Sequence, residues 1–376
     1  MNYAVKNIFT MLAAALALAM AFAASAEGSD VKDTGNAAEE YNGNPSLIAA
    51  LCQDYVDDAG ERAVADFGLG ILEGSEGLFV FASDDYSEEP PPNPMFPEPM
   101  EKGALYFGGT DLGRFIPESL VLSDGVRPDI SVITQNALAD SKYLSSVREQ
   151  LSGKVELPTD KEHEAAFNAF VAGVMSGKID ARDALEFGDG KVWVNGVSAV
   201  MAINKILAKN VFEKNKGKHA MYIEESWPFE WMCDYLTPHG LVMKLNAEKR
   251  SDFSDEAVRE NDEFWDWMTK RLLSSKEFAK SRSESWRKGA DGKQDPEHRM
   301  AVRGFARLRF AHARLYGSAK NRAAFETAIR QAVALDPLGP EIGYGYSLFL
   351  KARKLDAARN DYREYVTKFG GCSECL

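Results

Sequence analysis

The sequence predicts an α/β domain, with a mainly parallel sheet and crossover helices, followed by a C-terminal all-α helical domain. Two observations lead to this fold class. Short continuous apolar runs alternate with longer amphipathic stretches between residues 104 and 246, which is typical of buried parallel strands joined by helices. After Asn246 these runs stop, and apolar residues recur at helical spacing. We therefore divide the chain into an α/β domain at residues 46–250 and a helical domain at residues 251–376.

The N-terminal segment has the pattern of a secretory signal peptide. Lys6 precedes an apolar run at residues 8–24, and Ala24-Ser25-Ala26 forms a small-x-small cleavage pattern. The apolar run is shorter than the roughly 20 residues of a membrane-spanning helix. We expect residues 1–26 to be removed and the mature protein to be exported, soluble, and periplasmic or extracellular. Residues 27–45 are polar and acidic, which predicts a disordered leader.

The α/β domain is expected to begin with a helix, a strand and a loop. Apolar residues recur at helical spacing over residues 46–67, with Ser46 in a position to cap the helix. Residues 77–83 have the continuous apolar pattern of a buried strand. An acidic, proline-rich loop follows at residues 84–102, because its repeated prolines forbid regular structure.

Strands and helices then alternate along the rest of the domain. The expected strands are residues 104–109, 129–134, 219–226 and 240–246. The expected helices are residues 112–124, 137–151, 197–215 and 228–236. Residues 152–196 interrupt this rhythm as an insertion, with a helix at residues 161–175 and a hairpin-like run at residues 191–196. The alternating order implies right-handed crossovers between parallel strands.

The C-terminal region resembles tetratricopeptide helices. Residues 253–288 have helical patterning, and residues 296–370 read as helical pairs. Phe349, Ala358 and Tyr362 fall at the spacing at which that repeat places its packing residues, and Asp336-Pro337 closes the preceding helix. We count one complete repeat and a partial one. Three or more repeats are usually needed to stand alone, so we expect these helices to dock on the α/β domain.

Composition and cysteines exclude several classes of function. The chain has 57 acidic and 44 basic residues and a net charge of -13, which argues against broad nucleic-acid binding. Cys52, Cys233, Cys372 and Cys375 could pair in three ways; the expected bridges are a small ring between Cys372 and Cys375, or a tail paired with Cys52 or Cys233. The histidines lack metal-ligand spacing, and standard catalytic motifs are absent. We therefore predict no metal, cofactor or catalytic residue.

Polar side chains follow three of the predicted strands. Ligands bind outside the carboxyl ends of parallel strands, so these side chains define a candidate ligand site. The site residues are Gly109, Thr110, Asp111, Arg114, Gln135, Asn136, Glu224 and Glu225. Each group also has a structural interpretation. Thr110 or Asp111 could cap the next helix, and Asn136 could cap a helix beginning near Ala137. Glu224 or Glu225 could form an ion pair with a Lys or Arg on a neighbouring loop.

A second candidate surface is basic. Arg299, Arg303 and Arg307 are spaced four residues apart and share a helix face. This face is either solvated or binds an anionic partner. That partner could be the acidic loop of the same chain, which gives a hypothesis of internal docking.

Residues 107–140 resemble a stretch in a family of large bacterial multi-spanning membrane proteins of nominally unknown function, thought to be glycosyltransferases. In that family a strand leads into Gly-Asp-Asn-Asp-Thr-x-Pro, a helix, Gly-Val-Arg-Pro-Asp and another strand. The matching places are held here by Gly108 or Gly109, Asp111, Gly125, Val126, Arg127, Pro128 and Asp129. Residues 218–246 resemble the family's next strand, short helix and final strand. The resemblance is to the family's soluble extracytoplasmic tail, and it implies that fold and that compartment.

These observations predict binding rather than catalysis. The leading interpretation is an exported binding or scaffold protein that acts through its tetratricopeptide-like helices on a protein or envelope glycan. The alternative is a carbohydrate-binding or sugar-processing α/β module that uses the cluster around Asp111, Asn136 and Glu225. In that case Glu224 and Glu225 would serve as acid and base.

Overall fold

The computed structural model describes most of the chain from residue 66 onward. The described residues are 66–78, 90–109, 112–122, 125–181, 184–188, 191–224, 228–250, 252–276, 278 and 300–368. The predicted signal peptide at residues 1–26, the leader at residues 27–45 and nearly all of the helix predicted at residues 46–67 lie outside these ranges.

A five-stranded sheet in the order β3-β2-β6-β8-β7 forms the centre of the molecule. Its strands are β2 (Leu105–Gly108), β3 (Ser131–Thr134), β6 (Met221–Ile223), β7 (Leu236–His239) and β8 (Val242–Leu245). Strand β2 pairs in parallel with β3 and β6, whereas β8 is antiparallel to both β6 and β7. Four strands therefore run in one direction and β8 runs against them. The α/β class is confirmed, with a mixed sheet.

The second half of the sheet differs from the prediction. Residues 228–236 were expected to be a helix, but they form a 3-10 helix η3 (Glu230–Asp234) and the start of β7. Strand β7 then turns at Gly240 into β8, so the last expected strand is one arm of a hairpin. Pro238 lies within β7, and a proline is tolerated there because β7 is at the edge of the sheet.

Helices connect the parallel strands, as predicted. Helix α5 (Leu112–Leu122) joins β2 to β3, and η1 (Gln135–Ala137), α6 (Ser141–Gln150), α7 (Asp160–Met175) and α8 (Val197–Asn215) lie between β3 and β6. The prediction that Asn136 caps a helix near Ala137 is wrong. Helix α6 begins at Ser141, and its cap is Asp140, whose carboxylate accepts from the Lys142 amide at 2.8 Å.

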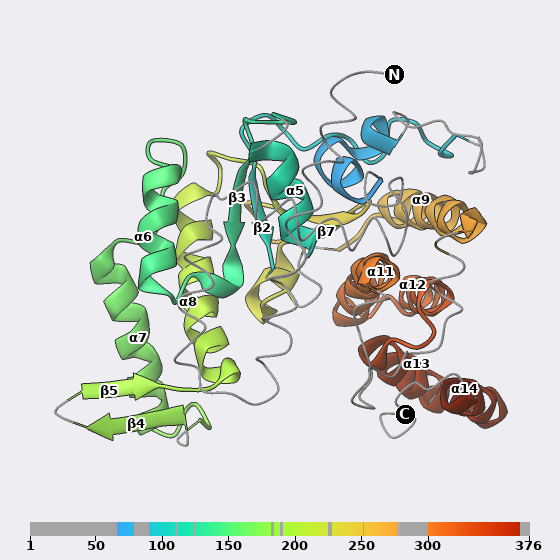
Figure 1. The fold of residues 1–376 in the computed structure, drawn as a ribbon. Coiled ribbons are helices and arrows are strands. Elements are labelled where there is room, and N and C mark those ends of the chain that lie inside the picture. Colours follow the sequence, from blue (N-terminus) through green and yellow to red (C-terminus); the bar gives the residue numbers. More distant parts are fainter. Residues whose placement is uncertain are drawn as a thin grey trace, which may run out of the picture.

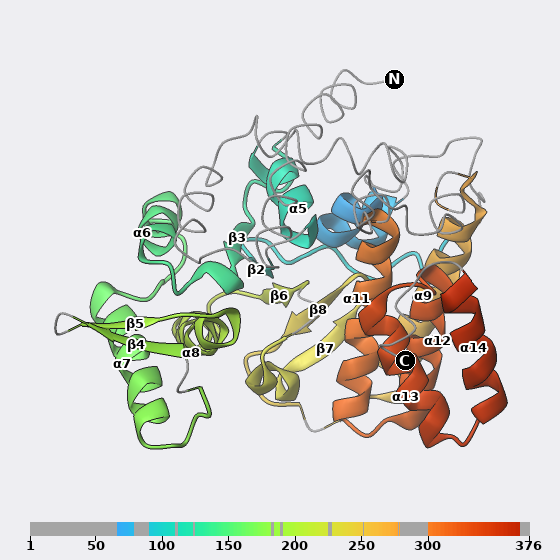
Figure 2. The ribbon, with the colours of Figure 1, turned by 60° about the horizontal axis from the view of Figure 1, so that its bottom comes forward.

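The insertion at residues 152–196 has the predicted content. Helix α7 is followed by an antiparallel hairpin of β4 (Leu185–Gly188) and β5 (Lys191–Val194). Figures 1 and 2 show this hairpin beside α7 and α8, apart from the five-stranded sheet. The insertion therefore adds a separate surface to the domain.

Residues 66–78 form a helix, so the strand predicted to begin at Gly77 does not begin there. The rest of that predicted strand lies outside the described residues. The glycines of this segment allow close packing: a Cβ at Gly68 would lie 2.6 Å from the side chains of Ile116 and Leu120.

The described part of the proline-rich loop, residues 90–102, has no helix or strand, as predicted. It is packed rather than freely exposed. Ser75 Oγ donates to the carbonyl of Pro94 at 2.8 Å, and Asn93 Nδ2 donates to Glu260 Oε1 at 2.9 Å. The loop thus lies between the helix at residues 66–78 and α9.

A layer of helices follows the sheet (Figure 2). It contains α9 (Asp255–Ser274), α11 (Met300–Ser318), α12 (Arg322–Leu335), α13 (Pro340–Ala352) and α14 (Asp356–Lys368). One continuous hydrophobic core runs from the sheet through α9 into α11, α12 and α13. The predicted docking of these helices on the α/β domain is therefore confirmed.

Candidate functional site

The carboxyl ends of β3, β2 and β6 lie next to one another. Gly108 is in register with Thr134, and the Glu224 amide donates to the carbonyl of Phe107 at 3.1 Å. The structure thus brings together Gly109, Gln135, Asn136 and Glu224 at one edge of the sheet. Thr110, Asp111 and Glu225 lie outside the described residues, and of Arg114 only its place in the first turn of α5 is described.

Gln135 is the unusual residue of this edge. Its side chain is 0% exposed, yet within the described part of the chain neither Oε1 nor Nε2 has a hydrogen-bond partner. The neighbouring Thr134 is also buried, and its Oγ1 has no partner among the same described residues. Each buried polar group without a hydrogen bond costs about 1–3 kcal/mol, so native proteins contain few of them. Two such side chains follow each other at the end of β3.

The backbone around Gln135 is firmly held by its neighbours. The Thr134 amide donates to Tyr143 Oη at 2.7 Å. Asn204 of α8 donates to the carbonyl of Asn136 at 2.6 Å and accepts from the Ala139 amide at 2.6 Å. Asn204 was missed by sequence reasoning, because a single Asn inside a helix carries no recognisable signal. These hydrogen bonds hold the backbone on both sides of Gln135, but none of them involves the Gln135 side-chain amide.

Charge at this edge comes from two sources. Glu224 is buried at the end of β6. Helix α5 begins directly beyond β2, and the N-terminus of a helix carries partial positive charge. Of the two carboxylates proposed as an acid–base pair, Glu224 is described and Glu225 lies outside the described residues.

The basic face has an internal partner. Arg303 and Arg307 lie 3.2 and 3.5 Å from the carboxylate of Glu341 at the start of α13. Burial raises the pKa of Glu341, but the two guanidinium groups outweigh burial and lower that pKa overall. Arg299 lies outside the described residues.

Internal docking of the acidic loop on this face is not what the described loop residues show. Glu101 of the loop pairs with Lys244 of β8 at 2.6 Å, and the acidic partner of Arg303 is Glu341. The order of the elements explains why Glu341 pairs with the basic face. Helix α13 follows α12 closely in sequence and delivers a carboxylate to α11, whereas the loop is held on α9.

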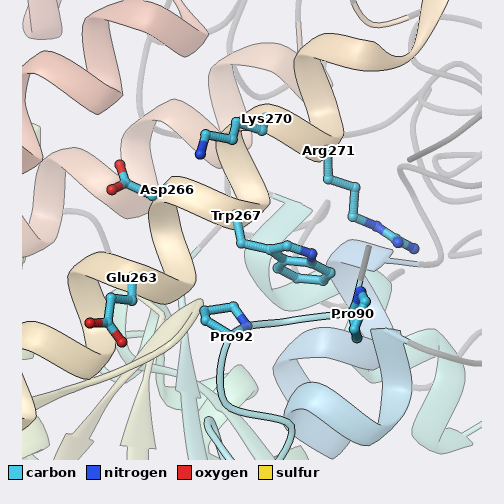
Figure 3. A pocket seen from close by; sticks show the side chains of 7 residues that line it. All are labelled: Pro90, Pro92, Glu263, Asp266, Trp267, Lys270 and Arg271. Carbon is cyan, nitrogen blue, oxygen red and sulfur yellow. The ribbon is translucent and has the colours of Figure 1, made fainter. Parts of the chain in front are cut away.

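A shallow pocket of about 300 Å³ lies between the proline-rich loop and α9 (Figure 3). Its walls include Pro90, Pro92 and Trp267, with Glu263, Asp266 and Lys270 at the side of α9. Most polar groups here already serve the fold. Glu263 pairs with Arg259 at 3.0 Å, Asp266 accepts from Gln331, and Arg271 binds Asp66 at 3.0 Å. The pocket was not predicted, and its polar side chains Glu263, Asp266 and Arg271 are engaged in structural bonds.

The described residues contain neither a candidate metal site nor a reactive thiol. Those residues contain no group of three or more His, Cys, Asp or Glu side chains that could hold a metal. Cys233 is a free thiol, and burial raises its pKa, which makes it a poor nucleophile. The disulfide candidates Cys372 and Cys375, and also Cys52, lie outside the described ranges. No helix among the described residues is long and apolar enough to cross a bilayer.

Comparison with known proteins found no match to a family model, to a curated protein or to a solved structure. The resemblance of residues 107–140 to a membrane-protein family therefore stays a prediction.

Proposed function

We propose that this protein is a non-catalytic binding protein, and that its ligand lies at the carboxyl edge of β3, β2 and β6. The single observation that carries the proposal is Gln135, a fully buried amide with no hydrogen-bond partner among the residues that the structure describes. Such a residue is costly to the free protein, and a ligand that bonds it recovers the cost. Open α/β sheets bind ligands at this edge for geometric reasons, since neighbouring strand ends and helix N-termini converge there.

The chemistry of the unsatisfied atoms indicates the class of ligand. A glutamine amide offers one acceptor oxygen and one donor NH₂ group, and a threonine hydroxyl both donates and accepts. Hydroxyl groups match all of these at once, because each of them also donates and accepts. A neutral polyhydroxyl ligand such as a saccharide fits better than an anion, since Glu224 is buried at the same edge. This supports the carbohydrate-binding alternative at Gln135 and Asn136.

Substitution of Gln135 by Met tests the proposal without knowledge of the ligand. Methionine has a similar shape and no polar group to leave unpaired, so the free protein should gain roughly 1–3 kcal/mol. The matched control is Asn215→Leu. Asn215 is equally buried but fully bonded, with Oδ1 accepting from Glu156 N at 3.0 Å and Nδ2 donating to the Glu156 carbonyl at 2.7 Å. That control should lose stability.

Ligand binding is then measured as stabilisation of wild type by soluble saccharides in thermal unfolding, because a ligand that binds only the folded state raises Tm. Saccharides that stabilise wild type should not stabilise Gln135→Met. A Gln135→Met protein that is less stable than wild type, like the Asn215 control, would show that Gln135 serves the fold alone.

A second candidate function is a scaffold that binds a protein partner through the helical layer, whose sequence resembles one complete tetratricopeptide repeat and a partial one. Its supporting observation is on α13, where Tyr344 and Leu348 are 55% and 46% exposed and lie one turn apart. Terminal repeats normally carry a polar outer face, so exposed apolar side chains there favour a partner. Deletion of the helices is unsuitable as a test because they share the core of the sheet. Capture of an envelope protein by wild type, and its loss in Tyr344→Ser/Leu348→Ser, is the appropriate measurement.

A further inference from the structure

The β4–β5 hairpin presents a small aromatic surface. Trp193 lies directly across the hairpin from Glu186, and Asn195 comes directly after the end of β5, two positions beyond Trp193. Directly paired residues, and residues two apart in a strand, point to the same face, so these three side chains share one side of the hairpin. Trp193 is 43% exposed, and Glu186 and Asn195 are exposed as well. Asn195 Nδ2 donates to Glu186 Oε2 at 3.0 Å, which orients the two planar groups beside the indole.

The other face of the hairpin packs against the domain. The opposite face carries Leu185, which is buried, and Val192 and Val194, which pack against the main core. That face holds the hairpin to the domain. The Trp193 face points away from it, and a large aromatic side chain there leaves apolar surface in water that a polar residue would not.

Size and charge restrict what this surface binds. A stable protein interface buries about 800 Å² on each partner, far more than one indole and two short polar side chains provide. A phosphate or nucleic acid is disfavoured by the carboxylate of Glu186 and by the net charge of -13. The surface matches a single ring of a neutral ligand.

We infer that the Trp193 face binds one residue of a saccharide chain. A pyranose with equatorial substituents has an apolar C–H face, which stacks on the indole. Its hydroxyls then meet Asn195 and Glu186. With the Asn195 NH₂ group already bonded to Glu186, the amide oxygen and the carboxylate remain as acceptors for hydroxyl donors. This surface lies on the insertion and is independent of the Gln135 site at the sheet edge.

The test uses wild type, Trp193→Ala and the control Phe187→Ala. Phe187 is 59% exposed on the same hairpin but on the opposite face, so its loss removes a comparable aromatic surface. Binding of cellohexaose, chitohexaose and laminarihexaose, whose β-linked rings expose C–H faces, is measured by calorimetric titration. Trp193→Ala should weaken binding at least tenfold, and Phe187→Ala should leave it unchanged. Circular dichroism and urea unfolding should be the same for all three proteins.

Three results of the saccharide titrations would overturn the inference. The first is that wild type binds none of the three hexasaccharides. The second is that Trp193→Ala binds as well as wild type, and the third is that Phe187→Ala weakens binding by the same factor as Trp193→Ala. Choline is titrated in parallel, because an indole beside a carboxylate could also hold a quaternary ammonium. Binding of choline without saccharide would likewise refute the saccharide assignment.

Discussion

Arg127 and Asp129 form a clamp at the amino-terminal edge of the sheet, opposite the candidate ligand site. Arg127 Nη2 lies 3.1 Å from Asp129 Oδ2 and donates to the carbonyl of Met100 at 2.6 Å, while Nη1 donates to the carbonyl of Leu72 at 3.2 Å. Asp129 also accepts from the Gly103 amide at 2.9 Å. The Arg-Pro-Asp sequence that stood out as a motif therefore ties together the helix at residues 66–78, the end of the proline-rich loop and β3.

Asp129→Asn should destabilise the protein by about 1 kcal/mol at neutral pH. The hydrogen bond from Arg127 is the main cause that lowers the pKa of Asp129 from 3.8 to about 2. The full shift corresponds to roughly 2 kcal/mol, which we halve because the pair is partly exposed to solvent. A lowered pKa means that the stabilisation is present above pH 3.8 and is lost as pH falls toward 2. Urea unfolding of both proteins between pH 7 and pH 2.5 checks this; a constant difference across that range would contradict it.

Arg309→Met should cost about 3–5 kcal/mol, because it breaks a buried ion-pair network and leaves the partly buried carboxylate of Asp262 without its charge partner. Arg309 is fully buried on α11; it pairs with Asp262 of α9 and donates to Gln331 Oε1 of α12 at 2.6 Å. Burial raises the pKa of Asp262, which Arg309 partly offsets. Guanidinium chloride unfolding gives the change in the free energy of unfolding.

The control for Arg309 is Arg353→Met. Arg353 pairs with Glu326 at 2.8 Å but is more than half exposed, and exposed ion pairs contribute about 0–1 kcal/mol. Equal losses in the two variants would show that the Arg309 network does not hold α9, α11 and α12 together.

These residues also show what the sequence could and could not reveal. The basic face of Arg299, Arg303 and Arg307 is predicted to be solvated or to bind a partner, yet Arg309, two residues further along the chain, is buried. Its carboxylate partner, Asp262, comes from α9, which is distant in sequence. Periodicity identifies which positions of α11 are basic, but it does not identify which of them meets an acid of another helix.

At the carboxyl edge of the sheet, the sequence likewise predicts some features of the candidate ligand site and not others. The rule that parallel strands end together was enough to place Gly109, Gln135, Asn136 and Glu224 side by side. The burial of Gln135 without a partner was not predictable, because it depends on how α6 and α8 cover the turn after β3. Strand β7 was missed because Leu236–His239 is short and contains Pro238, and only its place at the edge of the sheet makes it a strand.

Wild type should lose stability on acidification more steeply than His312→Gln. Burial is the main cause that lowers the pKa of His312 from 6.5 to about 3, with the nearby Arg309 charge and His239 adding to it. His312 Nδ1 lies 2.9 Å from the Leu308 carbonyl, and its ring packs against Trp265. Because the unfolded chain binds this proton near pH 6.5 and the folded chain does not until about pH 3, stability falls by up to ~1.4 kcal/mol per pH unit between those values. Parallel pH–stability curves for the two proteins would contradict the assignment.

Gly240→Ala should be among the most damaging small substitutions in the protein, because Gly240 joins the sheet to the helical layer. Its amide donates to Asn261 Oδ1 at 3.1 Å, and its carbonyl accepts from Trp265 Nε1 at 2.9 Å, so the turn between β7 and β8 is bonded directly to α9. Gly240 has φ +65°, and an added Cβ would overlap the ring of Pro97 in the proline-rich loop.

Gly125→Ala separates the two costs at Gly240. Gly125 has the same φ of +65°, but a Cβ there would meet nothing within 4 Å. It should therefore lose only about 1 kcal/mol, the cost of a left-handed backbone for a residue with a Cβ. Gly240→Ala should lose that amount and about 1–3 kcal/mol more from the overlap with Pro97. Urea unfolding followed by tryptophan fluorescence measures both losses. Equal values would mean that the loop moves aside freely, and that Pro97 does not brace the turn against α9.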